Sequence, residues 1–140
     1  MISLLRRFSH RESGAALVEF ALVLPMLLVV VVIIFDAGML LFDKAVIINA
    51  SREAARAGIV VNKLTDAAIQ AIATTYCFDQ LVTFDSNNKT CTTTITHPSV
   101  ATGNPLTVTV TYAYRGMLLG TLITIPQAAN LTATTIMNYE

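Results

Sequence analysis

The residues that decide the fold are 15–35, which read AALVEFALVLPMLLVVVVIIF. Glu19 is the one charged or strongly polar side chain in this run of 21 residues. As a helix the run would be about 31 Å long, enough to cross a hydrocarbon core of about 30 Å. The sequence therefore predicts a transmembrane helix over residues 15–35, with a carboxylate close to its beginning.

The charges around this helix predict its orientation. Residues 1–14 form a short basic leader with a net charge of +2, in which three arginines oppose Glu12. Residues 15–140 hold six basic and eight acidic residues. Because basic flanking residues favour the cytoplasmic side, we expect the leader in the cytoplasm and the C-terminal domain outside. The net charge of the whole chain is zero, which gives no support to nucleic-acid binding.

An amphipathic continuation of the helix is expected over residues 36–60. Alanines recur there at a helical spacing, at Ala50, Ala54 and Ala57. Gly58 then fits the position of a C-cap. We therefore predict one helix from about Ala16 to Ala57, with its first half in lipid and its second half in water. Pro25 lies inside this helix, where it removes a backbone hydrogen bond and predicts a kink.

A second, shorter helix is predicted at Leu64–Tyr76, inside a domain that extends over residues 61–140. Thr65 is a suitable N-cap. The apolar stripe expected to be buried consists of Ile69, Ile72, Ala73 and Tyr76.

Strands are predicted after this helix, because the period of the apolar residues changes to two. The alternation begins at residues 91–95, and Leu106–Tyr114 is its clearest example. Leu131–Met137 reads as the last strand, while the apolar residues 118–125 fit either a short helix or another strand. The fold class is therefore α+β, with three or four antiparallel strands packed on the long helix.

The two cysteines, Cys77 and Cys91, both lie in the domain expected outside the cytoplasm. A disulfide would close a loop of about 15 residues and contribute about 3 kcal/mol. Two reduced, buried thiols are the alternative. We favour the disulfide, because an exported domain matures in an oxidising compartment.

Few residues suggest enzymatic chemistry. Asp36 and Asp43 are seven residues apart and share a helix face, which would suit a cation, although a solvated face is the simpler interpretation. His10 and His97 are the two histidines, and His97 is expected in an exposed loop. We find no nucleophile–base set, phosphate loop or metal-ligand spacing. The sequence therefore predicts no enzyme, cofactor, metal or small-molecule substrate.

Glu19 needs an explanation, because a carboxylate inside a membrane is costly unless it has a partner. Cleavage after Gly14 would create a new amino group on Ala15, one helical turn from Glu19. That amine, on the same chain or on a neighbouring one, would offset the charge of the carboxylate. The alternative is an uncleaved chain in which Glu19 reaches the lipid headgroups.

The stretch GAALVEF at Gly14–Phe20 resembles the prepilin-peptidase motif of type IV pilins. The longer pattern, GAALVEFALVLP followed by SREAARAG at residues 51–58, resembles the TadE-like family of pseudopilins from the tight-adherence (Flp-type) pilus system. The resemblance covers residues 12–60 well and extends loosely to the C-terminal strand, which ends in NLTATTIMNYE. One departure is Ala15, since larger type IV pilins begin with phenylalanine.

The resemblance implies a pilin-like fold and a role in pilus assembly. An aspartic prepilin peptidase of the bacterial inner membrane would cut between Gly14 and Ala15, and Glu19 and Phe20 would match the Glu-Phe pair of the family. The partners implied are this peptidase, other pilins or pseudopilins and the inner-membrane assembly platform. The alternative is an uncleaved single-span anchor that displays a small periplasmic binding or scaffold domain.

Overall fold

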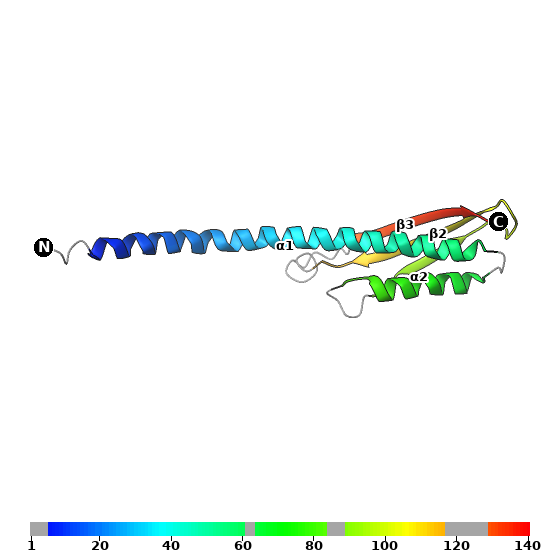
Figure 1. Cartoon of the computed structure of the whole chain (residues 1–140), viewed down its shortest axis with the longest axis horizontal. Helices are drawn as coiled ribbons and strands as arrows, with labels where there is room; N and C mark the ends of the chain where they lie inside the picture. Colours follow the sequence, from blue (N-terminus) through cyan, green and yellow to red (C-terminus); the bar gives the residue numbers. More distant parts are fainter. Residues whose placement is uncertain (1–5, 61–63, 84–88, 117–128) are drawn as a thin grey trace. The chain divides into compact units, whose positions relative to one another are not determined.

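The computed structural model describes residues 6–60, 64–83, 89–116 and 129–140 (Figure 1). The chain divides into two compact units, Met1–Phe35 and Asp36–Glu140. Within the described residues, two helices and three antiparallel strands form an α+β fold, as the sequence predicts.

Helix α1 spans Arg6–Gly58 and continues through Pro25. It begins well before the predicted start near Ala16. No proline lies between Arg6 and Ala16, so every amide in this interval can donate a helical hydrogen bond. Among the described residues, one stretch, Gly14–Gly58, is helical, long and apolar enough to cross a membrane.

The part of α1 that belongs to the first unit exposes its apolar side chains. From residue 14 to residue 35, all side chains are exposed except Leu24 and Val32, which are half-buried. Such a surface is unfavourable in water and favourable in hydrocarbon. The helix therefore has the surface expected of a membrane anchor.

The second half of α1 covers the core of the Asp36–Glu140 unit. The predicted alanine stripe is correct at Ala50 and Ala54, whereas Ala55 is fully buried and Ala57 is half-buried. Two polar side chains connect this helix to the last strand. Ser51 Oγ lies 2.7 Å from Thr135 Oγ1, and Lys44 Nζ donates to the backbone oxygen of Thr132.

Gly58 ends α1, but it does not have the left-handed conformation of a C-cap glycine. Among the described residues, a positive φ occurs at Gly103. A Cβ on Gly58 would lie 2.6 Å from Leu106 Cδ2 and 2.8 Å from Ile69 Cδ1. Residue 58 therefore has to be small because a strand and the second helix pack against it, and the predicted capping role is wrong.

Helix α2 spans Asp66–Gln80, and Thr65 is its N-cap as predicted. The Thr65 hydroxyl accepts from the amide of Ala68 at 3.3 Å. The helix ends four residues later than the expected Tyr76, so that its buried stripe includes Cys77. Ile69 and Ala73 are buried as predicted, whereas Ile72 and Tyr76 are only partly buried.

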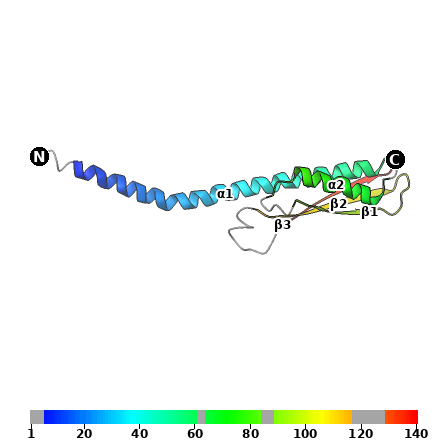
Figure 2. The same cartoon turned by 90° about the horizontal axis from the view of Figure 1, so that it is seen from below.

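The sheet consists of β1 (Thr92–Thr96), β2 (Pro105–Tyr114) and β3 (Ala129–Asn138), in the order β1-β2-β3. Both pairings are antiparallel, and β2 is central. Figure 2 shows α1 and α2 on one side and the strands on the other. Residues 118–125, for which the sequence predicts a short helix or another strand, lie outside the described residues. The alternation predicted for β2 is confirmed, because every second side chain is buried, at Leu106, Val108, Val110, Tyr112 and Tyr114.

Candidate functional site

The segment that carries the sequence motif lies in the first unit, within α1. Gly14, Ala15 and Glu19 are helical, and their side-chain positions are exposed. A Cβ on Gly14 would meet no atom within 4 Å. Packing within the described part of the chain therefore does not require glycine at this position.

Glu19 lies on the same helical face as Ala15, one turn further along. Its side chain is exposed, as is that of Phe20, at 62%. Within the described residues Glu19 makes no hydrogen bond or ion pair. A carboxylate on a helix of this apolar character needs a partner or the polar interface, and the described part of the chain provides no partner.

Asp36 and Asp43 occupy a different environment, at the beginning of the second unit. Their exposed fractions are 5% and 0%, so the expectation of a solvated helix face is wrong. The carboxylate of Asp36 lies against Gly116, and the Tyr114 hydroxyl donates to the backbone oxygen of Asp36 at 3.1 Å. The end of β2 therefore covers this turn of α1, which sequence periodicity alone does not reveal.

The carboxylate of Asp43 is only partly compensated. The amide of Val82 donates to Asp43 Oδ1 at 3.1 Å, whereas Oδ2 is buried without a hydrogen-bond partner. Burial raises the pKa of Asp43, and the hydrogen bond from Val82 lowers it by a smaller amount. Protonation would give Oδ2 a donor and remove a buried charge.

Tyr114 remains a neutral hydrogen-bond donor over the physiological pH range. Burial raises its pKa to about 12, and the charges of Asp36, Asp43 and Tyr112 act in the same direction. Within the described residues, no group of three or more His, Cys, Asp or Glu side chains is placed to hold a metal ion. The described contacts of Asp36, Asp43 and Tyr114 have a structural role, because they attach α1 to β2 and to the segment after α2.

The comparisons with known proteins bear on α1. Residues 14–56 match the family model described as TadE-like protein. This segment is TadE-like. The match begins at Gly14, includes Glu19 and ends two residues before the end of α1. It confirms the resemblance seen in the sequence. No curated protein and no solved structure matches the chain.

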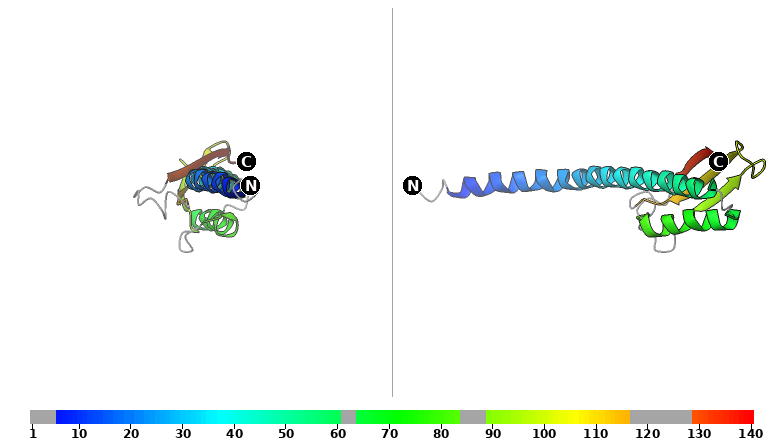
Figure 3. Two further views of the ribbon diagram at one scale, coloured as in Figure 1. Left: turned by 90° about the vertical axis from the view of Figure 1, so that its left-hand side faces the viewer. Right: turned by 45° about the vertical axis from the view of Figure 1, so that its right-hand side comes forward.

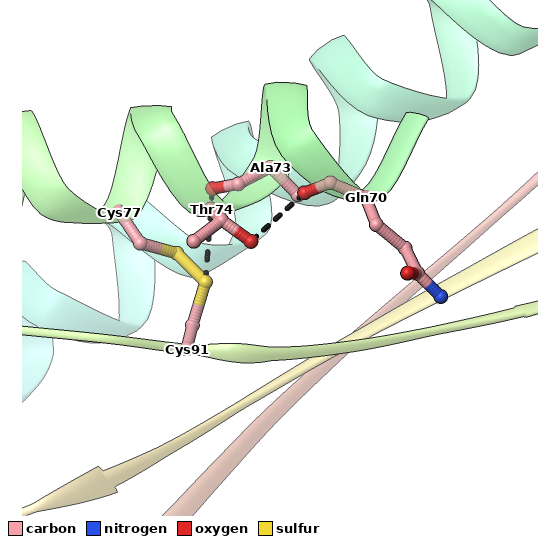
Figure 4. Close-up of a disulfide and its surroundings, with 5 residues drawn as sticks. All are labelled: Gln70, Ala73, Thr74, Cys77 and Cys91. Atoms are coloured by element: carbon pink, nitrogen blue, oxygen red, sulfur yellow. Dashed lines mark hydrogen bonds between the residues drawn. A yellow bond between two sulfur atoms is a disulfide. The ribbon is translucent and has the colours of Figure 1, made fainter. Parts of the chain in front are cut away.

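The predicted disulfide is present in the domain that follows the TadE-like segment. Cys77 in α2 is bonded to Cys91, which precedes β1, with a Cα–Cα distance of 6.1 Å (Figure 4). Cys91 Sγ also lies 3.6 Å from the carbonyl oxygen of Ala73. An oxidised sulfur has no proton to donate, so this approach is a packing contact. The bond fixes α2 to the first strand.

His97 lies in the loop after β1, as predicted, but it is half-buried rather than exposed. Its Nε2 atom lies 3.2 Å from Asp66 Oδ1, and its ring meets Tyr139 edge-on at 6.2 Å between centroids. Burial raises the pKa of Tyr139, and the charge of Asp66 adds to this effect. The contacts join the beginning of α2 to the end of the chain and provide no nucleophile.

Proposed function

We propose that the protein is a minor pseudopilin that is cut after Gly14 and acts in the assembly of a tight-adherence, Flp-type pilus. The observation that carries this proposal is the TadE-like match over residues 14–56, which begins at the glycine of the proposed cut. A family of this kind is associated with the pilus and the membrane. Processing and the assembly step are what the proposal adds.

The environment of Gly14 supports processing. Its position is exposed, and no neighbour within 4 Å would exclude a side chain there. Recognition by a prepilin peptidase gives a reason for glycine that packing does not. Cutting the bond to Ala15 would release the basic leader and leave the apolar helix on the mature chain.

Glu19 supports a role in assembly, because it is exposed and makes no contact with a base in the described part of the chain. In the mature protein it would lie one turn from the new amino group of Ala15. Between two parallel helices offset along their axes, the carboxylate of one chain would meet the amine of the next. Such a pair would neutralise both charges in lipid and set the axial offset of the subunits.

The proposed location is the bacterial inner membrane, with the leader in the cytoplasm and the Asp36–Glu140 unit in the periplasm. The apolar surface of α1 supports membrane anchoring, and the basic leader supports this orientation. The Cys77–Cys91 bond agrees with an oxidising compartment. The partners would be the prepilin peptidase, other pilins or pseudopilins and the assembly platform, and the role would be structural rather than enzymatic.

Mass spectrometry of the intact chain tests the proposal. In cells that contain the prepilin peptidase, we expect a mature chain that begins at Ala15, and in cells without it the full-length chain. Gly14→Ala should leave the leader in place, while Gly38→Ala, a change at another exposed helical glycine without neighbours, should be processed normally. Full-length protein in peptidase-containing cells would instead favour an uncleaved anchor that displays the periplasmic domain.

A further inference from the structure

Four large apolar side chains are exposed at the end of the Asp36–Glu140 unit where α1 enters it. They are Leu41 and Phe42 on α1, Phe78 in the last turn of α2, and Val82 just after α2, with exposed fractions of 67%, 47%, 59% and 40%. We call these four residues the apolar rim. Side chains of this size are expensive to leave in water, and none of the described elements covers them.

The rim residues lie on two segments, α1 and the end of α2 with the residues after it, which meet at one end of the unit. The hydrogen bond from Val82 to Asp43 brings the residue after α2 next to α1, one position beyond Phe42. Figures 1 and 3 show α2 running back alongside the second half of α1, so that its last turn lies at the end where α1 enters. The rim is therefore a feature of one end of the unit.

Charged groups near the rim on α1 point away from its surface. Asp36 and Asp43 are buried, and Lys44 donates to the backbone of β3. The exposed surface of α1 between residues 37 and 42 therefore carries no charge. On α2, Asp79 and Gln80 are exposed beside Phe78. Exposed apolar side chains with polar neighbours suit the boundary between headgroups and acyl chains better than the hydrocarbon core.

We propose that the apolar rim inserts into the headgroup region of a phospholipid bilayer, so that the domain is held against the membrane surface. Leu41 lies only six residues after Phe35, the last residue of the predicted transmembrane segment, so the sequence places the first rim residues directly after the segment expected in lipid. This inference rests on the membrane anchoring in the proposed function but is independent of cleavage at Gly14.

Depth-dependent fluorescence quenching in vesicles tests the inference. The chain contains no tryptophan, so each single-tryptophan variant of the full chain reports on one position. Phe42→Trp and Phe78→Trp probe the rim, and Leu28→Trp probes the membrane segment. Val100→Trp is the matched control, because Val100 is exposed to 39% and lies beside Ile59 and Tyr139, beyond the end of α1. The vesicles contain phosphatidylcholine brominated either near the headgroup or near the end of the acyl chain.

We expect headgroup-proximal bromines to quench the two rim tryptophans at least twofold more than Trp at position 100, and deeper bromines to quench Leu28→Trp most. Rim fluorescence that is quenched no more than the control, while Leu28→Trp is quenched, would overturn the inference and leave membrane anchoring intact. The emission of the rim tryptophans could instead shift to the blue as the protein density rises, without quenching by the bromines. That result would show that a second copy covers the rim, and it would also overturn the inference. An unquenched Leu28→Trp would refute anchoring and the rim together.

Discussion

The carboxylate of Asp36 lies against the backbone of Gly116, so closely that a Cβ on residue 116 would be 2.7 Å from Oδ2 and 3.0 Å from Cγ. Two residues earlier, the Tyr114 hydroxyl donates to the carbonyl oxygen of Asp36 at 3.1 Å. These two contacts hold the first turn of α1 in the second unit to the end of β2. The residue at position 116 therefore has to be small for a reason of packing.

Gly116→Ala is expected to lower the free energy of unfolding of the domain by about 1–3 kcal/mol, because the added methyl group overpacks against a buried carboxylate. Urea unfolding of the full chain in detergent micelles, followed by near-UV circular dichroism of the tyrosines, measures the change. Gly38→Ala is the matched control. Nothing lies within 4 Å of its Cβ position, so it should be neutral or stabilise the helix by up to about 1 kcal/mol. Equal effects of the two substitutions would contradict the role given to Gly116.

Loss of the disulfide is expected to destabilise the domain without unfolding it under native conditions. The Cys77→Ser, Cys91→Ser double variant should lose about 3 kcal/mol, the value for a loop of this length. The same unfolding measurement, on oxidised wild type, reduced wild type and the double variant, separates the bond from the packing of the sulfurs. A loss below about 1 kcal/mol on reduction would show that the contact between α2 and Cys91 does not depend on the bond.

Asp43 is expected to make the stability of the domain depend on pH. Burial raises its pKa above the unfolded value of 3.8. The contribution of this group is therefore fully present below the unfolded pKa and is lost as the pH rises through the folded pKa. Asp43→Asn cannot ionise and keeps an oxygen for the amide of Val82. Relative to wild type, the variant should gain stability as the pH rises from the unfolded pKa through the raised folded pKa of Asp43, and the gain should be constant above that pKa. A difference that is the same at every pH would count against this account.

The sheet and the short helix could be predicted from the sequence because their signals are local. The alternation in β2 follows from the pleat of a strand, which places every second residue on one face. The N-cap at Thr65 follows from the hydrogen-bonding capacity of its own hydroxyl. The cysteine pair followed from the expected compartment. Each of these signals depends on residues close in sequence or on the environment of the whole domain.

The surroundings of Asp36, Asp43 and Gly58 could not be predicted, because they depend on distant parts of the chain. Two aspartates on one face of a helix look solvated until the end of β2 and the segment after α2 are placed over them. Gly58 was interpreted as a cap because glycine often ends helices, whereas Leu106 and Ile69 require a small residue there. Helical periodicity shows which residues share a face, but it does not show what covers that face.

Glu19 carries the last prediction, which concerns assembly. Glu19→Ala and Glu19→Gln should both be processed after Gly14, because the glycine is unchanged, yet both should strongly reduce the number of pili. The reason is that each removes the charge proposed to pair with the amino group of Ala15. Intact-mass measurement establishes processing, and electron microscopy of whole cells counts the pili. Glu53→Gln is the matched control, since Glu53 is an exposed carboxylate on the same helix, beyond the apolar run.

The two readouts separate the roles of this segment. If both Glu19 variants are processed but their cells carry few or no pili, the carboxylate acts after cleavage, as the amine pairing requires. A variant that is not processed would place Glu19 in peptidase recognition instead. Full piliation by Glu19→Ala would refute the pairing, because an uncharged side chain cannot offset the amine in lipid. Glu19 makes no ion pair in the described part of the chain, and the prediction assigns the role of its partner to the amino group of Ala15.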